Sequence, residues 1–181
     1  MPAPLSLTVR RPANHFLCVV FEFISGRFEQ TITLRSGDGE TVHQWRDAFA
    51  SENEDWPGSP PIQQLSLESI RGAMTLLGVG QAGKSHWSVS VETVGDGDDA
   101  VLRFDVACRT SQVPEWLGSR YYELVAPSVG HPAMKLHGDR VTPEAILVEL
   151  AIALPVQVPP LQKMPPNKPL AKTHRWCYRV S

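Results

Sequence analysis

Hairpins are the feature of this sequence that most limits its possible folds. The segment SHWSVSVETV, residues 85–94, alternates apolar and polar side chains, and AVLRFDVACR, residues 100–109, alternates again after the turn GDGDD. A period of two is typical of strands that bury one face, and glycine and aspartate favour the tight turn between such strands. The two segments therefore predict an antiparallel hairpin.

The amino-terminal part of the chain follows the same pattern. Its turns are Ser25-Gly26 and SGDG at residues 36–39, which are residue types that tolerate a positive φ. Between these turns the chain is rich in Val, Ile, Thr and Phe, which favour strands. The expected strands are LSLTVRR, HFLCVVFEFI, FEQTITLR and ETVHQW, with SRYYELVA and THRWCYRV later in the chain.

Two segments favour helices. TPEAILVELAIAL, from Thr142 to Leu154, has a threonine cap, a proline at the first helical position and a body that is apolar nearly all round. IQQLSLESIRGAM, residues 62–74, has spacings compatible with a short amphipathic helix. We therefore predict an α+β fold, mainly antiparallel β, in which a barrel or strongly curved sheet closes over the buried carboxy-terminal helix and a second short helix is possible.

The length favours a single domain over residues 1–181, because a chain of this size can bury a sizeable core without disulfides or metals. SENEDWPGSPP, residues 51–61, is acidic and rich in proline, and predicts an exposed loop. The segment 155–172 is also rich in proline and predicts an extended strap across the surface.

Composition excludes several classes of protein. The net charge is −2 and 42% of the residues are hydrophobic, as in ordinary soluble proteins. The longest apolar run, FLCVVFEFI, is too short to span a bilayer. Three scattered cysteines indicate a reduced compartment, so we expect a cytoplasmic protein without a membrane segment. A slightly acidic chain lacks the broad positive field that nucleic-acid binding requires, although its last twenty residues are basic.

A glycine-rich segment, LLGVGQAGKSHW at residues 76–87, matches the phosphate-loop pattern G-x-x-x-x-G-K-S/T. In such a loop the glycines let backbone N–H groups converge on phosphate oxygens, the lysine reaches the terminal phosphates, and the serine or threonine binds magnesium. The candidate anion-binding residues are Gly78, Gly80, Gly83, Lys84, Ser85 and His86.

The residues after Lys84 do not favour nucleotide hydrolysis. A phosphate loop requires an α-helix to begin there, because the first amides and the dipole of that helix complete the anion site. SHWSVSVETV is instead typical of a strand, and the chain shows hairpins rather than alternating strands and helices. We interpret the match as accidental and the segment as a turn between strands. Such a turn either binds an anion through its amides and polar side chains or is a solvated connection.

The titratable side chains predict no metal or cofactor site, and the catalytic residues, if there are any, stay unknown because they would come from distant parts of the chain. None of the six histidines has metal-ligand spacing, and His174 and Cys177 would lie on opposite faces of a strand. Neighbours on a strand also point apart, so Ser85 and His86 do not form a nucleophile and base by adjacency.

One element of the sequence resembles known proteins. Leu77-Gly78 is followed, after an insertion, by Ser85-His86, a strand of valines and the strand FDVACR. This resembles a family of small bacterial proteins of unknown function in which a Leu-Gly-x-Ser-His element joins two strands. The resemblance implies that GQAGK is an inserted loop, and it implies no activity.

Three functions remain open at this point. The first is a non-enzymatic domain that binds a small anionic ligand or a protein partner. The second is an enzyme acting on a nucleotide or another phosphate-containing substrate, with Lys84 and Ser85 contacting phosphate and Asp105 available for a metal. The third is a homo-oligomeric structural component. We favour the first, and therefore do not expect an enzyme.

Overall fold

Antiparallel strands make up most of the described molecule. The computed structural model describes residues 2–48, 54–138 and 170–181. The strands form one sheet and are β1 (Leu5–Arg11), β2 (His15–Ile24), β3 (Arg27–Arg35), β4 (Thr41–Asp47), β5 (Ile62–Ile70), β6 (Ala73–Ala82), β7 (Ser85–Val94), β8 (Val101–Thr110), β9 (Tyr121–Val125), β10 (Leu136–Gly138) and β11 (Lys172–Val180). Two short 3-10 turns, η1 (Pro12–Asn14) and η2 (Gly97–Asp99), join β1 to β2 and β7 to β8.

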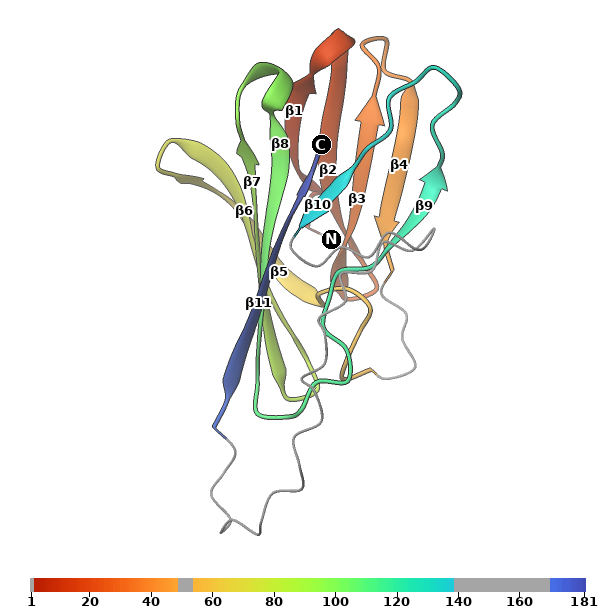
Figure 1. Cartoon of the computed structure of the whole chain (residues 1–181). Coiled ribbons are helices and arrows are strands. Elements are labelled where there is room, and N and C mark those ends of the chain that lie inside the picture. Colours follow the sequence, from red (N-terminus) through yellow and green to blue (C-terminus); the bar gives the residue numbers. More distant parts are fainter. Residues whose placement is uncertain (1, 49–53, 139–169) are drawn as a thin grey trace.

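The sheet divides at β3. Near its start, Phe28 pairs with Ile62 of β5, whereas residues 31–35 pair with β4, which in turn pairs with β9. From β5 the sheet continues through β6, β7, β8 and β11 to β10. Figure 1 shows β3, β4 and β9 on one side of the molecule and β6, β7, β8 and β11 on the other. We call these two groups of strands the two arms of the sheet: β3, β4 and β9 form one arm, and β6, β7, β8 and β11 form the other. The arms face each other and enclose the core.

Turn chemistry fixes the hairpins. Ser25 and Gly26 between β2 and β3 have φ values of 50° and 87°, and Arg71 and Gly72 between β5 and β6 have values of 52° and 85°. Two successive residues with positive φ form the type of turn whose twist matches that of paired strands. The predicted turn at Ser25-Gly26 is confirmed, as is the hairpin of β7 and β8.

Aromatic side chains from the two arms meet in the core. Trp87 of β7 packs edge to face on Trp176 of β11 with ring centroids 6.0 Å apart, and Phe104 of β8 stacks on Tyr178 at 4.7 Å. Tyr121 of β9 reaches the same place from the other arm, with its ring centroid 6.2 Å from that of Tyr178. These side chains are almost fully buried, so they hold the two arms together.

The core also contains an interior polar cluster, formed by Arg27, Gln30, Asp47, Tyr121 and Tyr178. The Arg27 guanidinium lies 3.3 Å from the Asp47 carboxylate, which accepts the Gln30 backbone N–H at 3.2 Å. The Gln30 amide donates to the Tyr121 hydroxyl at 2.6 Å, and that hydroxyl lies 2.5 Å from the hydroxyl of Tyr178. The chain of hydrogen bonds thus crosses from β3 and β4 to β9 and β11.

The structure corrects the predicted α+β class. No helix of the described residues is longer than the single turns η1 and η2, and the sheet has free ends at β1 and β10, so it is not a barrel. The short helix predicted over residues 62–74 is wrong: residues 62–70 form β5, with Leu65 and Leu67 facing the core side and Gln64 and Ser66 the other. The helix predicted from Thr142 to Leu154 lies outside the described residues.

The loop predicted as exposed over residues 51–61 is also different in its described part. Trp56 and Ser59 are buried, and the Ser59 hydroxyl donates to the backbone carbonyl of Arg120 at 2.9 Å. Proline and glycine here allow the chain to pack closely against β5 and β6 without regular structure. Of the predicted strap over 155–172, only residues 170–172 are described, and they are exposed. In the described segments no helix has the length and apolar character needed to cross a membrane.

Candidate anion-binding site

The phosphate-loop pattern falls on a hairpin turn. Ala82 at the end of β6 pairs directly with Ser85 at the start of β7, so Gly83 and Lys84 alone make the turn. Gly83 has a φ of 52°, which favours glycine. The backbone after Lys84 is extended rather than helical. The predicted turn between two strands is confirmed, and the helix that a nucleotide-binding phosphate loop requires is absent from this position.

Two glycines of the pattern serve strand packing. A Cβ on Gly80 would lie 1.6 Å from the backbone oxygen of Pro61, and a Cβ on Gly78 would lie 2.8 Å from side-chain atoms of Ile62 and Val89. The chain at the start of β5 therefore crosses β6 too closely for any side chain. Glycine allows the backbone of Pro61 to approach at position 80 and the side chains of Ile62 and Val89 to pack at position 78.

Ser85 is buried and faces the core. Its hydroxyl donates to the Thr110 hydroxyl at 3.0 Å on the neighbouring strand β8. It shares its face with the buried residues Trp87 and Val89, as alternation along a strand requires. Its side chain therefore does not lie on the same surface as that of His86.

Lys84 and His86 do lie on one surface, together with Arg109. His86 of β7 is the direct cross-strand neighbour of Arg109 on β8, and Arg109 is in turn opposite Thr173 on β11. Partners in an antiparallel pair share a face, so their side chains all point away from the core. Lys84 follows at the adjacent turn and is exposed.

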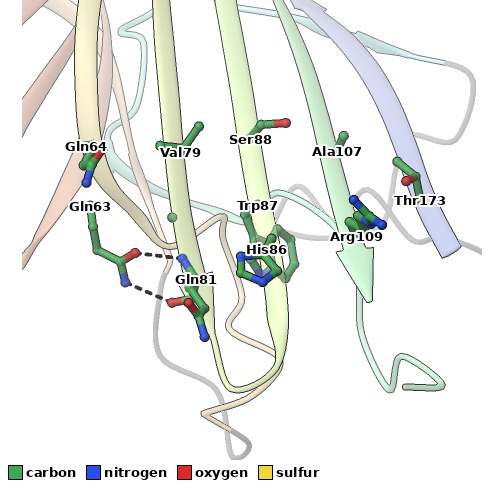
Figure 2. Close-up of a pocket in the computed structure, with 11 residues that line it drawn as sticks. Gln63, Gln64, Val79, Gln81, His86, Trp87, Ser88, Ala107, Arg109 and Thr173 are labelled. Carbon is green, nitrogen blue, oxygen red and sulfur yellow. Dashed lines mark hydrogen bonds between the residues drawn. The ribbon is translucent and has the colours of Figure 1, made fainter. Parts of the chain in front are cut away.

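His86, Arg109 and Thr173 border a cavity on the outer face of the sheet, which we call the outer depression. It has a volume of about 590 Å³ and spans β5 to β8 and the start of β11. Figure 2 shows His86 and Arg109 at its lower end and Val79, Ser88 and Ala107 across its upper part. The central side chains, Ser88 and Ala107, are small, whereas those at the rim are long. This difference in size makes the surface concave.

Amide side chains supply the other polar groups of the outer depression. The Gln63 amide accepts the backbone N–H of Gln81 at 2.7 Å and donates to its carbonyl at 2.9 Å, as the dashed lines in Figure 2 show. The Gln81 amide donates to the Gly83 carbonyl at 2.9 Å, which braces the turn that carries Lys84. Gln64 is exposed at the rim.

The charges of this outer face divide into paired and unpaired groups. Farther along the strands, Arg103 pairs with Glu92, and Arg175 pairs with Asp105 through two nitrogens. Near the turn, Lys84 and Arg109 have no ion-pair partner among the described residues. The Asp55 carboxylate lies against Gly83, so one negative charge stands near this end of the sheet. Its charge offsets only part of the local positive charge.

The histidine that does have a carboxylate partner, His43, is not available for chemistry. His43 is buried, and its Nδ1 accepts the backbone N–H of Met134 at 2.8 Å. Its Nε2 lies 2.6 Å from the Glu123 carboxylate and 3.0 Å from the Trp45 Nε1, which donates to it. Both ring nitrogens are occupied, so this imidazole holds β4 against β9. Within the described segments no group of three or more His, Cys, Asp or Glu side chains could hold a metal ion.

Sequence reasoning found Lys84 and His86 but missed Arg109, Gln64 and Thr173. The alternation of residues 100–109 places Arg103, Asp105 and Arg109 on one face, which is a usable signal. Arg109 lies opposite His86 through the register of the predicted β7–β8 hairpin, which the sequence does not specify, and opposite Thr173 through pairing with the distant strand β11. Comparison with known protein families, with characterised proteins and with solved structures gives no match.

Proposed function

We propose that this protein binds a small anionic ligand on its outer face without transforming it. The ligand lies against Lys84, His86 and Arg109 at the end of the outer depression. This proposal keeps two members of the sequence-based candidate set, Lys84 and His86, and adds Arg109. The glycines and Ser85 contribute indirectly, because they allow the hairpin to pack and so position the turn.

One observation carries the proposal: two full positive charges and an imidazole converge at the end of a cavity and lack anionic partners among the described residues. Like charges placed side by side repel each other, so their convergence costs free energy in the absence of an anion. Arginine and lysine donate strong charge-assisted hydrogen bonds to oxyanions. On the same face Arg103 and Arg175 are paired with carboxylates, whereas Arg179, which is also unpaired among the described residues, does not line either cavity.

The surrounding groups favour binding over catalysis. His86 has no carboxylate to orient it among the described residues, and the Ser85 hydroxyl is directed into the core and already bonded. A nucleophile, a base and an orienting acid therefore do not meet here. Asp105, considered for a metal, is bonded to Arg175 on another part of the face.

Thermal denaturation with inorganic phosphate tests the proposal. Ligand that binds only the folded state stabilises it by RT ln(1 + [L]/Kd), so millimolar phosphate should raise the melting temperature above that in chloride of equal ionic strength. The double variant Lys84→Gln, Arg109→Gln should lose this shift. Arg179→Gln is the matched control, because Arg179 is exposed on β11 and does not line the outer depression.

Two results would contradict the proposal. One is the absence of any phosphate-dependent shift in the natural protein, and the other is an equal shift in the double variant and in the control. Turnover of ATP or GTP with magnesium that is lost in Lys84→Gln would instead favour the enzyme that we consider less well supported.

A further inference from the structure

The cationic end of the site is a hollow of its own. A second cavity of about 490 Å³ is bordered by Lys84, His86, Arg109, Ser111 and Ala171, and we call it the cationic hollow. His86 and Arg109 also border the outer depression, so the two cavities meet at this pair of side chains. A ligand long enough to touch both would therefore pass over or between His86 and Arg109.

The two cavities differ in chemistry. In the cationic hollow the charged groups are a lysine and an arginine, and the exposed Ser111 supplies a hydroxyl. The Thr110 oxygen is already used, because it lies 3.0 Å from the Ser85 hydroxyl and accepts the Gln112 backbone N–H at 3.0 Å. Donors that approach from a turn and two strands suit a tetrahedral oxyanion, and two full positive charges suit a dianion.

The outer depression, apart from the shared His86 and Arg109, is lined by uncharged groups. The amide of Gln64 and the hydroxyls of Ser88 and Thr173 face the cavity around the small side chains Val79 and Ala107. The one aromatic residue among the lining residues, Trp87, is buried at 2% exposure and packs on Trp176, so it offers no ring face for stacking. The cavity therefore offers an amide and two hydroxyls that can bond to hydroxyl groups of a ligand, and no ring on which a flat aromatic base could stack.

We infer that the ligand is a phosphate monoester of a hydroxyl-rich body, that is, a sugar phosphate. Its phosphate lies in the cationic hollow, against Lys84, Arg109 and Ser111. Its body lies across the outer depression over Ser88 and Ala107, with Gln64 and Thr173 bonding to its hydroxyls. This inference rests on the proposed function, because it specifies what the anion is attached to.

Calorimetric titration of the full chain tests the inference with named probes. The probes are glucose 6-phosphate, ribose 5-phosphate, glycerol 3-phosphate, phenyl phosphate, inorganic phosphate and glucose. We expect at least one of the three hydroxylated esters to bind about fivefold or more tightly than inorganic phosphate, since two added hydrogen bonds of ordinary strength suffice for this gain. Glucose alone should show no measurable binding.

Variants separate the two parts of the ligand. Gln64→Ala should weaken the hydroxylated ester and leave inorganic phosphate unchanged, whereas Arg109→Gln should weaken both. Ser66→Ala is the matched control, because Ser66 lies one position further along the same face of β5 and does not line the cavity. The side chain of Gln64 is exposed and forms no hydrogen bond within the described part of the chain, so we expect its replacement to leave the fold intact.

The outcomes distinguish this inference from the function on which it rests. If inorganic phosphate binds in an Arg109-dependent way and no hydroxylated ester binds more tightly, the sugar phosphate is excluded and the anion site remains. If phenyl phosphate binds most tightly, the body of the ligand is apolar and the inference is overturned. If none of the phosphates binds, both proposals fail.

Discussion

The interior polar cluster and the anion-binding site are both groups of polar side chains contributed by several strands, yet they differ in how their hydrogen bonds are satisfied. In the core, the Asp47 carboxylate has Arg27 and the backbone N–H of Gln30 as partners, and the Tyr121 hydroxyl has both the Gln30 side-chain amide and the Tyr178 hydroxyl. On the outer face, Lys84 and Arg109 lack partners among the described residues.

This difference separates a structural role from a binding role. Buried polar groups are retained when each finds a partner, because an unsatisfied group in the core costs about 1–3 kcal/mol. A solvated cation does not need a protein partner. Lys84 and Arg109 can therefore stay unpaired in the free protein and bind an anionic ligand. The following predictions test each side of this contrast, beginning with the largest expected effect.

Removing an aromatic ring from the core should have the largest effect. Tyr178→Ala removes a fully buried side chain that stacks on Phe104 and hydrogen bonds to Tyr121. We expect the free energy of unfolding to fall by about 3–5 kcal/mol, as measured by urea denaturation. Tyr122→Ala, on the exposed side of β9, is the control and should change stability by less than about 0.5 kcal/mol. Equal losses in the two variants would contradict this view of the core.

The interior polar cluster should make stability depend on pH. Burial raises the pKa of Asp47 from 3.8 to about 6, against the opposing effect of Arg27. The folded state therefore holds this proton more tightly than the unfolded state does. The stabilisation is complete below pH 4 and is lost as the pH rises through 6, so the contribution of this group to the free energy of unfolding should fall by about 3 kcal/mol over that range.

Asp47→Asn identifies the group responsible. The variant side chain stays neutral, so the fall in stability between pH 4 and 7 should become shallower by the amount that Asp47 contributes. Asp105→Asn, an exposed-face carboxylate paired with Arg175, should keep the fall of the natural protein. Urea denaturation at pH 4.5 and 7 measures both. A natural protein and an Asp47→Asn variant with the same pH dependence would show that another group is responsible.

The glycines of the phosphate-loop pattern should matter for stability. Gly80→Ala places a methyl group where the backbone oxygen of Pro61 already lies, and a backbone cannot rotate away as a side chain can. We expect a loss of about 1–3 kcal/mol in the free energy of unfolding. Ser90→Ala, on the adjacent strand β7, is the control and should be nearly neutral. A stable Gly80→Ala protein that loses only phosphate binding would instead support a phosphate cradle.

A substitution in the anion-binding site should change phosphate affinity and leave stability unchanged. Arg109→Gln should change the free energy of unfolding by less than about 0.5 kcal/mol, because Arg109 is exposed and unpaired among the described residues. It should weaken phosphate binding about tenfold, which is the expected loss of one charge-assisted hydrogen bond. Denaturation and calorimetry of the same preparation give both values. If the variant is less stable and its affinity for phosphate is unchanged, Arg109 has a structural role and not a binding role.

Local signals predicted much of the sheet from sequence, but one strand was mistaken for a helix. The turn residues Ser25 and Gly26 and the alternation of residues 85–94 specify hairpins directly. The segment 62–70 has Ile62, Leu65, Leu67 and Ile70, whose spacings of three, two and three fit either period. Arg71 and Gly72 distinguish a strand from a helix here. Both have positive φ values and form a hairpin turn, which a continuous helix would not allow.

The site was predictable only in part, for a related reason. Lys84 and His86 are adjacent to the turn, so a local motif located them. Ser85 has the same parity as Trp87 and Val89, a signal that its side chain faces the core, but the motif match places it among the candidate anion-binding residues. Arg109 lies on the other strand of the predicted β7–β8 hairpin, and its position opposite His86 follows from the register of that hairpin, which depends on the geometry of the turn.

The most direct test of the central claim, that an anion binds where Lys84, His86 and Arg109 converge, is a phosphate titration followed by ¹H–¹⁵N NMR. We predict that the shifted amides gather at residues 83–86 and 109–111 and at Thr173, while those of the interior polar cluster stay in place. Shifts centred instead on the cavity beside Arg10 and Asn14 at the other end of the sheet, or no shifts at millimolar phosphate, would contradict it.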